Sequence, residues 1–284
     1  MLWLSRRMTV RILWVGLTYL LLLGATLVWA FPVLWVVLTS LKPRTEIFTV
    51  PPTIFFSPTL EHYAEALRTQ GIVPSIRNSL VIACLSTFLA LMVAVPAGYA
   101  YGRLRFRLRT HLAFYTLFTQ MAPPIGLVIP YFLVLNRLRM LDSYVGMVTI
   151  YLTFTVPFSV WLMITYFQDL PRELEEAAAV DGASRLTTFL RIMVPQVRGG
   201  IAVAAIFAFI DSWNEFLYAV VLTGTTTRTA TVAIFGFLAA EESRWGPFTA
   251  TGVMIMAPVI LVALVAQRHI VQGLSLGAIR TGRR

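Results

Sequence analysis

The stretch EEAAAVDGASRLTTFLRIMVP, residues 175–195, is a charged segment between two long apolar runs. Counting from residue 169, it belongs to a region that gathers five of the 13 acidic residues of the chain: Asp169, Glu173, Glu175, Glu176 and Asp181. Arginines 172, 185 and 191 lie among them. Ionised side chains at this density need water, so the region predicts a solvated loop that joins the two apolar runs.

The composition places those apolar runs in a membrane. Of 284 residues, 58% are hydrophobic and only 13% are charged, which is outside the range of ordinary soluble domains. Six segments are long enough to cross a hydrocarbon layer about 30 Å thick; they are residues 12–40, 76–101, 112–136, 144–167, 199–223 and 247–267. The sequence therefore predicts an all-α, polytopic membrane protein with six transmembrane helices, forming one domain over residues 1–284.

The basic residues fix an expected orientation. With the N-terminus inside, 15 of the 23 Lys and Arg residues fall on the inner side, most densely in RLRFRLR at 103–109. Both termini and the loop 169–198 are thus expected in the cytoplasm. Residues 41–75, with five prolines and one short helical stretch, are expected to form an outer loop. Topology also explains the net charge of +10 better than nucleic-acid binding does.

The charged loop reads as two short helices separated by a turn. Pro171 suits a first helical turn, strong helix formers continue to Val180, and Gly182 suits a helix end because it accepts positive φ. Ser184 can cap a second helix that ends at Pro195. From the residues alone, a solvated connection and a projection that docks on a partner remain equally open.

The spacing within this loop resembles a known motif. EAA, then Gly after three residues, then I-x-V-P after nine more, is similar to the EAA---G---------I-LP loop of bacterial ABC importer permeases of type I. The matching residues are Glu176, Ala177, Ala178, Gly182, Ile192 and Pro195, while Val194 replaces the usual leucine. SLKPRTEIF, the NSL at 78–80, WNEF at 213–216 and QRHIVQGLSLGAIR extend the resemblance to the carbohydrate-uptake, maltose-type branch of that family.

This resemblance implies a set of partners. The chain would be a multi-pass protein of the prokaryotic inner membrane that works with a second permease subunit, two ATP-binding cassette ATPases and an extracytoplasmic sugar-binding protein. The implied ATPase-coupling residues are Glu175, Glu176, Ala177, Ala178, Asp181, Gly182, Ala183, Ile192 and Pro195. The only lysine, Lys42, has no P-loop around it. ATP and Mg²⁺ are therefore expected on the ATPases, and this chain is expected to be neither an enzyme nor a cofactor carrier.

A polar stripe within the fifth apolar segment predicts a second site. Asp211, Asn214, Glu215 and Tyr218 recur at helical spacing, with Trp213 beside them. In the third segment, Gln120 precedes the helix-breaking pair Pro123 and Pro124, which could free backbone groups to line a cavity. These eight residues are candidates for a sugar pathway, because amide, carboxyl and aromatic groups suit a sugar. Hydrogen bonding between helices is the competing interpretation.

Other chemistry finds little support in the sequence. Cys84 is alone, and His62, His111 and His269 lack the spacing of a metal site. Three rival functions stay open: the same class of importer with a glycerophosphodiester or other polar cargo, a proton-coupled secondary carrier, and an intramembrane enzyme using Asp211 and Glu215 as an acid/base pair.

Overall fold

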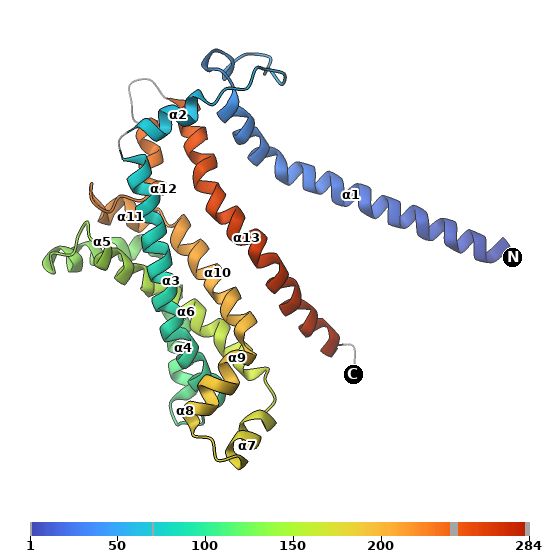
Figure 1. The fold of residues 1–284 in the computed structure, drawn as a ribbon, viewed down its shortest axis with the longest axis vertical. Helices are drawn as coiled ribbons and strands as arrows, with labels where there is room; N and C mark the ends of the chain where they lie inside the picture. Colours follow the sequence, from blue (N-terminus) through green and yellow to red (C-terminus); the bar gives the residue numbers. More distant parts are fainter. Residues whose placement is uncertain (1, 70, 239–243, 282–284) are drawn as a thin grey trace. The chain divides into compact units, whose positions relative to one another are not determined.

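The computed structural model describes residues 2–69, 71–238 and 244–281, and within these ranges it contains helices and loops but no strand (Figure 1). The predicted all-α class is confirmed. By their internal contacts the residues form two compact units, Met1–Thr69 with Phe237–Met254, and Gln70–Gly236 with Ile255–Arg284. The expected positions of Met1, Arg283 and Arg284 lie outside the described residues.

The first unit begins with the long helix α1, Leu2–Leu41. Its apolar stretch, Trp14–Leu41, exposes most of its large side chains, among them Trp29 at 84% and Val28 at 72%. Apolar side chains this exposed need lipid or a protein partner around them. The predicted outer loop follows, with the 3-10 helix η1, Arg44–Glu46, and the short helix α2, Glu61–Arg68. The helix α13, Trp245–Thr281, starts in the same unit.

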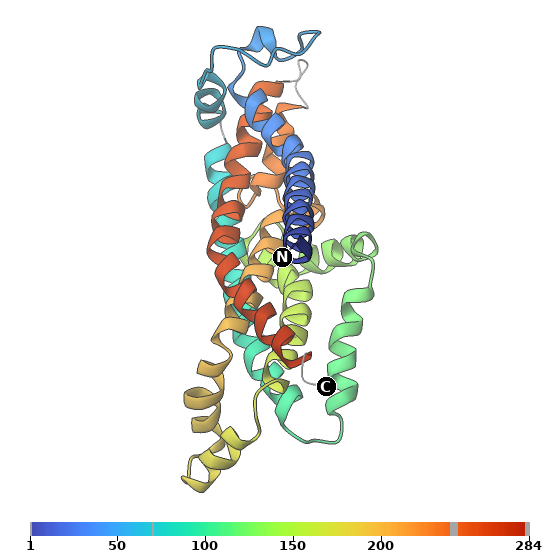
Figure 2. The same cartoon turned by 90° about the vertical axis from the view of Figure 1, so that its right-hand side faces the viewer.

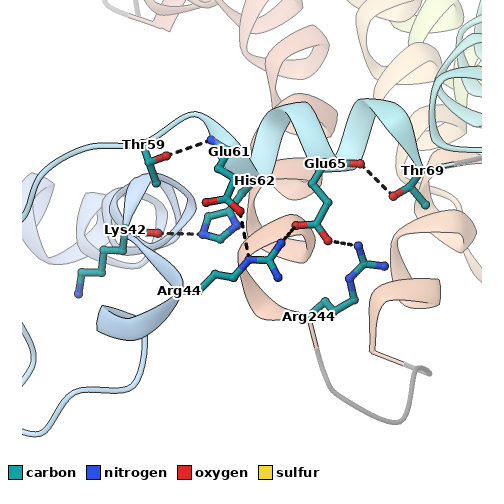
Figure 3. Close-up of polar contacts among 8 residues, drawn as sticks. All are labelled: Lys42, Arg44, Thr59, Glu61, His62, Glu65, Thr69 and Arg244. Carbon is teal, nitrogen blue, oxygen red and sulfur yellow. Dashed lines mark hydrogen bonds and ion pairs between the residues drawn. The ribbon is translucent and has the colours of Figure 1, made fainter.

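Ion pairs join the parts of the loop that follows α1 (Figure 3). Glu65 on α2 pairs with both Arg44 and Arg244, and Arg44 also lies 3.5 Å from the Glu61 carboxylate. The buried His62 ring shares a hydrogen bond of 2.8 Å between its Nε2 and the Lys42 carbonyl oxygen. One acidic helix therefore joins the end of α1 to the start of α13 within this unit.

The second unit is built on three packed helices, α3 (Ile72–Arg103), α6 (Tyr144–Gln168) and α10 (Arg198–Asn214). Small residues let the backbones approach: a Cβ atom on Gly98 would overlap Met163 of α6. Buried apolar side chains form two clusters, one around Met147 and Tyr151 and one around Met163 and Phe167. In Figure 2 these helices run side by side through the unit.

Two of the predicted spans are bent rather than straight. The third predicted span runs through α4 (Arg109–Phe118), the 3-10 helix η2 (Thr119–Met121) and α5 (Pro124–Arg137). A bend of 95° separates η2 from α5. The break falls at Pro123 and Pro124, which cannot donate helical hydrogen bonds. The fifth predicted span begins just after a bend of 73° between the helical segments Arg185–Gln196 and Arg198–Asn214. Four described helices could cross a membrane, or six if each bent pair is one span.

Hydrogen bonds gather the loops of this unit at two opposite ends of α3. At its start, Asn78 donates to the carbonyls of Thr226 and Arg228, and Thr226 donates to Asp142. At its other end, Arg103 binds Glu175 of α7, Glu173–Val180, and the carbonyl of Leu170 in the segment that leads into it. Loops predicted to share a side of the membrane therefore lie together. The short helices α11 (Leu217–Leu222), α12 (Ala230–Ala233) and η4 (Ile234–Phe237) follow α10.

Candidate functional site

The charged loop folds as its turn residues predict. Helix α7 ends at Val180, and Gly182 adopts a φ of +76°, which side-chain-bearing residues rarely take. The Ala183 N–H then donates to the Ala178 carbonyl at 2.9 Å and closes the helix end. Ser184 caps α8, Arg185–Thr187, by accepting a hydrogen bond from the Thr187 N–H at 3.2 Å. The chain continues through the π-helix η3, Thr188–Met193, and α9, Val194–Gln196.

The exposed surface of this loop carries both acidic and apolar side chains. Glu176, Ala177, Asp181 and Gly182 are exposed, and Val180 is 88% exposed. Leu186 of α8 is also exposed, at 66%. We call Glu176, Ala177, Val180, Asp181 and Leu186 the loop face. Of the other motif residues, Pro195 is exposed, Ala183 and Ile192 are half-buried and Ala178 is buried. Exposed apolar side chains beside acids are typical of an interface.

Glu175 points the other way, into the protein. Its carboxylate accepts hydrogen bonds of 2.8 Å from the Arg103 Nε and from the Tyr99 hydroxyl. Arg103 also donates to the carbonyl oxygens of Leu170 (2.8 Å) and Pro171 (3.2 Å), and its side chain is only 5% exposed. These contacts tie the start of α7 to the end of α3. We call Tyr99, Arg103 and Glu175 the α3–α7 clamp.

The clamp contains residues that the sequence did not single out for function. Arg103 opens the basic run 103–109, for which the sequence favours a solvated topology anchor over attraction of anionic lipid headgroups. Tyr99 lies in an apolar run and carries no motif. Their partner, Glu175, is more than 70 residues away in the sequence. The periodicity of a single helix cannot predict a contact between residues that far apart. The remaining signal was the position of Arg103 two residues after the predicted span 76–101.

The second candidate site is interrupted where a continuous helix was expected. Helix α10 ends at Asn214, and the Glu215 carboxylate accepts hydrogen bonds from the N–H groups of Tyr218 (2.9 Å) and Ala219 (3.0 Å) at the start of α11. The Tyr151 hydroxyl also donates to it at 3.3 Å. Glu215 therefore caps a new helix, and the single helical face predicted for Asp211 to Tyr218 is wrong.

The structure divides the other pathway candidates by exposure. Asp211, Asn214 and Gln120 are exposed, as are Pro123 and Pro124 at the 95° bend, and the Gln120 Nε2 donates to the Phe154 carbonyl at 2.8 Å. Trp213 is only 1% exposed and donates its indole N–H to the Ile255 carbonyl at 3.1 Å, while Tyr218 is buried beside Tyr131 and Phe154. Polar groups exposed at span depth indicate a water-filled path or a protein partner.

The described part of the chain contains no group of three His, Cys, Asp or Glu residues that could hold a metal ion. The side chains of the stretch QRHIVQGLSLGAIR, including His269, lie outside the described ones, although its backbone continues α13. What the described sites offer is a surface for a protein partner and polar groups for a solute, with no assembled catalytic set.

Comparison with known proteins gives consistent findings. The family described as "Binding-protein-dependent transport system inner membrane component" matches residues 86–276. A probable ABC transporter permease protein, y4oR, of Sinorhizobium fredii is 35% identical over 253 residues, covering 89% of this chain and 91% of that protein. The trehalose/maltose transport system permease protein MalG of Thermococcus litoralis is 32% identical and covers 92% and 96%.

The fold is also similar to a solved structure, that of a bacterial ABC transporter involved in the import of the acidic polysaccharide alginate. The TM-score is 0.76 at 24% identity, and the match covers 89% of this chain and 95% of that one.

Proposed function

This chain belongs to the family of inner membrane components of binding-protein-dependent transport systems, and we propose that it is one of two permease subunits in an ATP-driven importer of sugars. A second permease completes the path, two separate ATPases supply the energy, and an extracytoplasmic binding protein delivers the cargo. The similarity to a trehalose/maltose permease over 92% of the chain supports a sugar as the cargo.

The single observation that carries the energetic part of this proposal is the loop face. It combines exposed acids with exposed Val180 and Leu186, and the α3–α7 clamp connects it rigidly to a long spanning helix. A protein partner that binds the loop face and moves would therefore also move α3. We assign the loop face to an ATPase, because nucleotide-driven closure of two ATPase subunits would move the two loops that they bind.

Exposed polar groups support the transport path. Asp211 and Asn214 on α10 and Gln120 near the Pro123 bend remain exposed in the single chain. An ionised or polar side chain facing lipid would cost several kcal/mol, so a second permease or water covers them. Their amide and carboxyl groups can bind sugar hydroxyls, while the buried Trp213 and Tyr218 support the surrounding helices.

Charge reversal on the loop face tests the proposal. Glu176→Lys places a cation at the centre of the loop face, and Gly182→Pro cannot adopt the φ of +76° that the turn requires. We expect either variant to reduce copurification of the ATPases at least about tenfold, since like-charge and backbone mismatches at an interface cost about 2 kcal/mol or more. Both variants should still insert into the membrane at the normal level.

Asp169→Lys is the matched control, because it reverses an exposed acid at the end of α6 outside the motif. It should leave ATPase copurification and uptake near the normal level. Full copurification and uptake in the Glu176→Lys variant would show that the loop face does not bind the ATPase.

A further inference from the structure

A pocket of about 360 Å³ opens where the end of α3 meets α7 and α8. Its polar lining consists of Tyr99, Arg103, Arg105, Glu175, Arg185 and Thr188. The volume falls in the usual range of ligand pockets, roughly 300–1,000 Å³. None of the five loop-face residues lines this pocket, although Glu175 and Ala183 of the loop motif do.

The charges around the pocket are unbalanced. Three guanidinium groups face one carboxylate, and that carboxylate, of Glu175, is bound by Arg103. In the described part of the chain, Arg105 and Arg185 form no ion pair. Two cations that share a cavity repel each other unless an anion joins them. Arginine is well suited to phosphate, because its planar donors form two parallel hydrogen bonds with phosphate oxygens.

The position of the pocket indicates which phosphate-bearing molecule could reach it. Arg103 is the last residue of α3, a helix apolar and long enough to cross a membrane. In the following segment, 104–108, the exposed basic residues Arg105 and Arg107 alternate with Phe106 and Leu108, which are 41% and 57% exposed. Such a pattern fits the membrane surface, where rings and alkyl groups enter the acyl layer and guanidinium groups reach the headgroups.

We propose that this pocket binds the phosphate group of an anionic phospholipid, with Arg105 and Arg185 as its two donors. The phosphodiester occupies the space between the end of α3 and α8, and its acyl chains extend past Phe106 into the lipid. Because Arg105 follows α3 and Arg185 lies on α8, the phosphate would link the end of α3 to the coupling loop. The proposal does not depend on which partner binds the loop face.

A lipid titration with matched variants tests this site. The full-length chain, purified with its natural partners in detergent, is titrated with short-chain phosphatidylglycerol, with phosphatidylcholine of the same chain length, or with inorganic phosphate, and thermal unfolding is followed. The pocket variant is Arg105→Gln/Arg185→Gln. The control, Arg107→Gln/Arg191→Gln, removes one exposed charge from the segment 104–108 and one from η3, and neither residue lines the pocket. Arg105→Lys/Arg185→Lys keeps the charge and loses only the planar donors.

We expect phosphatidylglycerol to bind the unmodified protein about thirtyfold more tightly than phosphatidylcholine, since each of the two arginines near anionic lipid contributes about 1 kcal/mol. The pocket variant should lose most of this preference, the lysine variant should keep part of it, and the control should keep it within about twofold. Equal losses in pocket variant and control would overturn the assignment to this pocket. Protection by inorganic phosphate as strong as that by phosphatidylglycerol would overturn the lipid as the ligand and assign a soluble phosphate instead.

Discussion

Two adjacent acids, Glu175 and Glu176, show how one position changes the role of a residue. Both lie in the first turn of α7, and the sequence assigned both to ATPase coupling. The Glu175 carboxylate is bound by Arg103 and Tyr99, whereas Glu176 is exposed one residue further on. Successive helical residues point about 100° apart, so neighbours in the sequence serve different surfaces. Glu176 is therefore the residue available to a partner, and Glu175 connects the helix to the spanning core.

Asp142 provides a residue-level prediction at the other end of the second unit. Its carboxylate accepts hydrogen bonds from the Thr226 N–H (3.0 Å) and from the Thr227 N–H and hydroxyl (2.8 Å each). Burial works against its ionisation, but these hydrogen bonds outweigh burial and hold the pKa of Asp142 well below its usual range. Asp142→Asn removes the charge, and we expect a loss of about 1–2 kcal/mol in unfolding free energy.

The pH dependence of that loss follows from its sign. A carboxyl group with a lowered folded pKa stabilises the protein fully above its unfolded pKa, near 4. That contribution disappears only as the pH falls through the folded pKa. The difference in unfolding free energy between the unmodified protein and the Asp142→Asn variant should thus be the same at pH 7 and pH 5, measured by thermal or denaturant unfolding. A difference that vanishes between these two values would contradict the assignment.

At the scale of elements, the α3–α7 clamp is the mechanical joint of the proposed function. Arg103 makes hydrogen bonds to one side chain and two carbonyl oxygens of the segment before and within α7, so α7 cannot shift without moving the end of α3. Helix α3 in turn packs closely on α6 and α10. In the proposed function, a displacement of the loop face would thereby reach all three packed helices.

Breaking the clamp should separate ATP hydrolysis from transport. In Arg103→Gln, Glu175→Gln and the double variant, we expect the ATPases to remain bound, because the loop face is unchanged, while the number of solute molecules moved per ATP falls several-fold. The two single effects should not add, and a coupling energy of about 0.5–3 kcal/mol is normal for residues in contact. Arg107→Gln, an exposed residue outside the clamp, is the control. Additive effects, or normal transport per ATP in both single variants, would exclude the clamp as the joint.

The ends and breaks of helices differ in how far the sequence predicts them. The turn at Gly182, the cap at Ser184 and the short helix α2 agree with the structure, because each depends on local chemistry. Helix α7 starts at Glu173, two residues after Pro171, which was expected in its first turn. Pro123 and Pro124 also signalled a break, although not its angle of 95°. The break at Glu215 was missed, since apolar runs continue on both sides and the capping contact depends on how the chain folds back.

At the scale of the whole molecule, apolar run length was enough to predict an all-α membrane protein, and the fold matches that of a solved ABC transporter chain. The inner membrane location came from the resemblance of the loop motif. The sequence motif also led to the correct family. The count of six spans and the cytoplasmic position of both termini remain predictions. Contacts between distant segments, such as Tyr99 and Arg103 with Glu175 or Trp213 with Ile255, needed the structure because they join residues far apart in the chain.

Uptake by reconstituted vesicles tests the central claim most directly. Vesicles are prepared with the complete assembly of this chain, its second permease, the ATPases and the binding protein, and in parallel with this chain alone. A labelled sugar that the binding protein retains is then offered from outside, with ATP or a non-hydrolysable analogue inside. The account predicts accumulation above the external concentration only with the complete assembly and hydrolysable ATP, and its loss in the Glu176→Lys variant. Accumulation by this chain alone, in vesicles free of nucleotide, would contradict it.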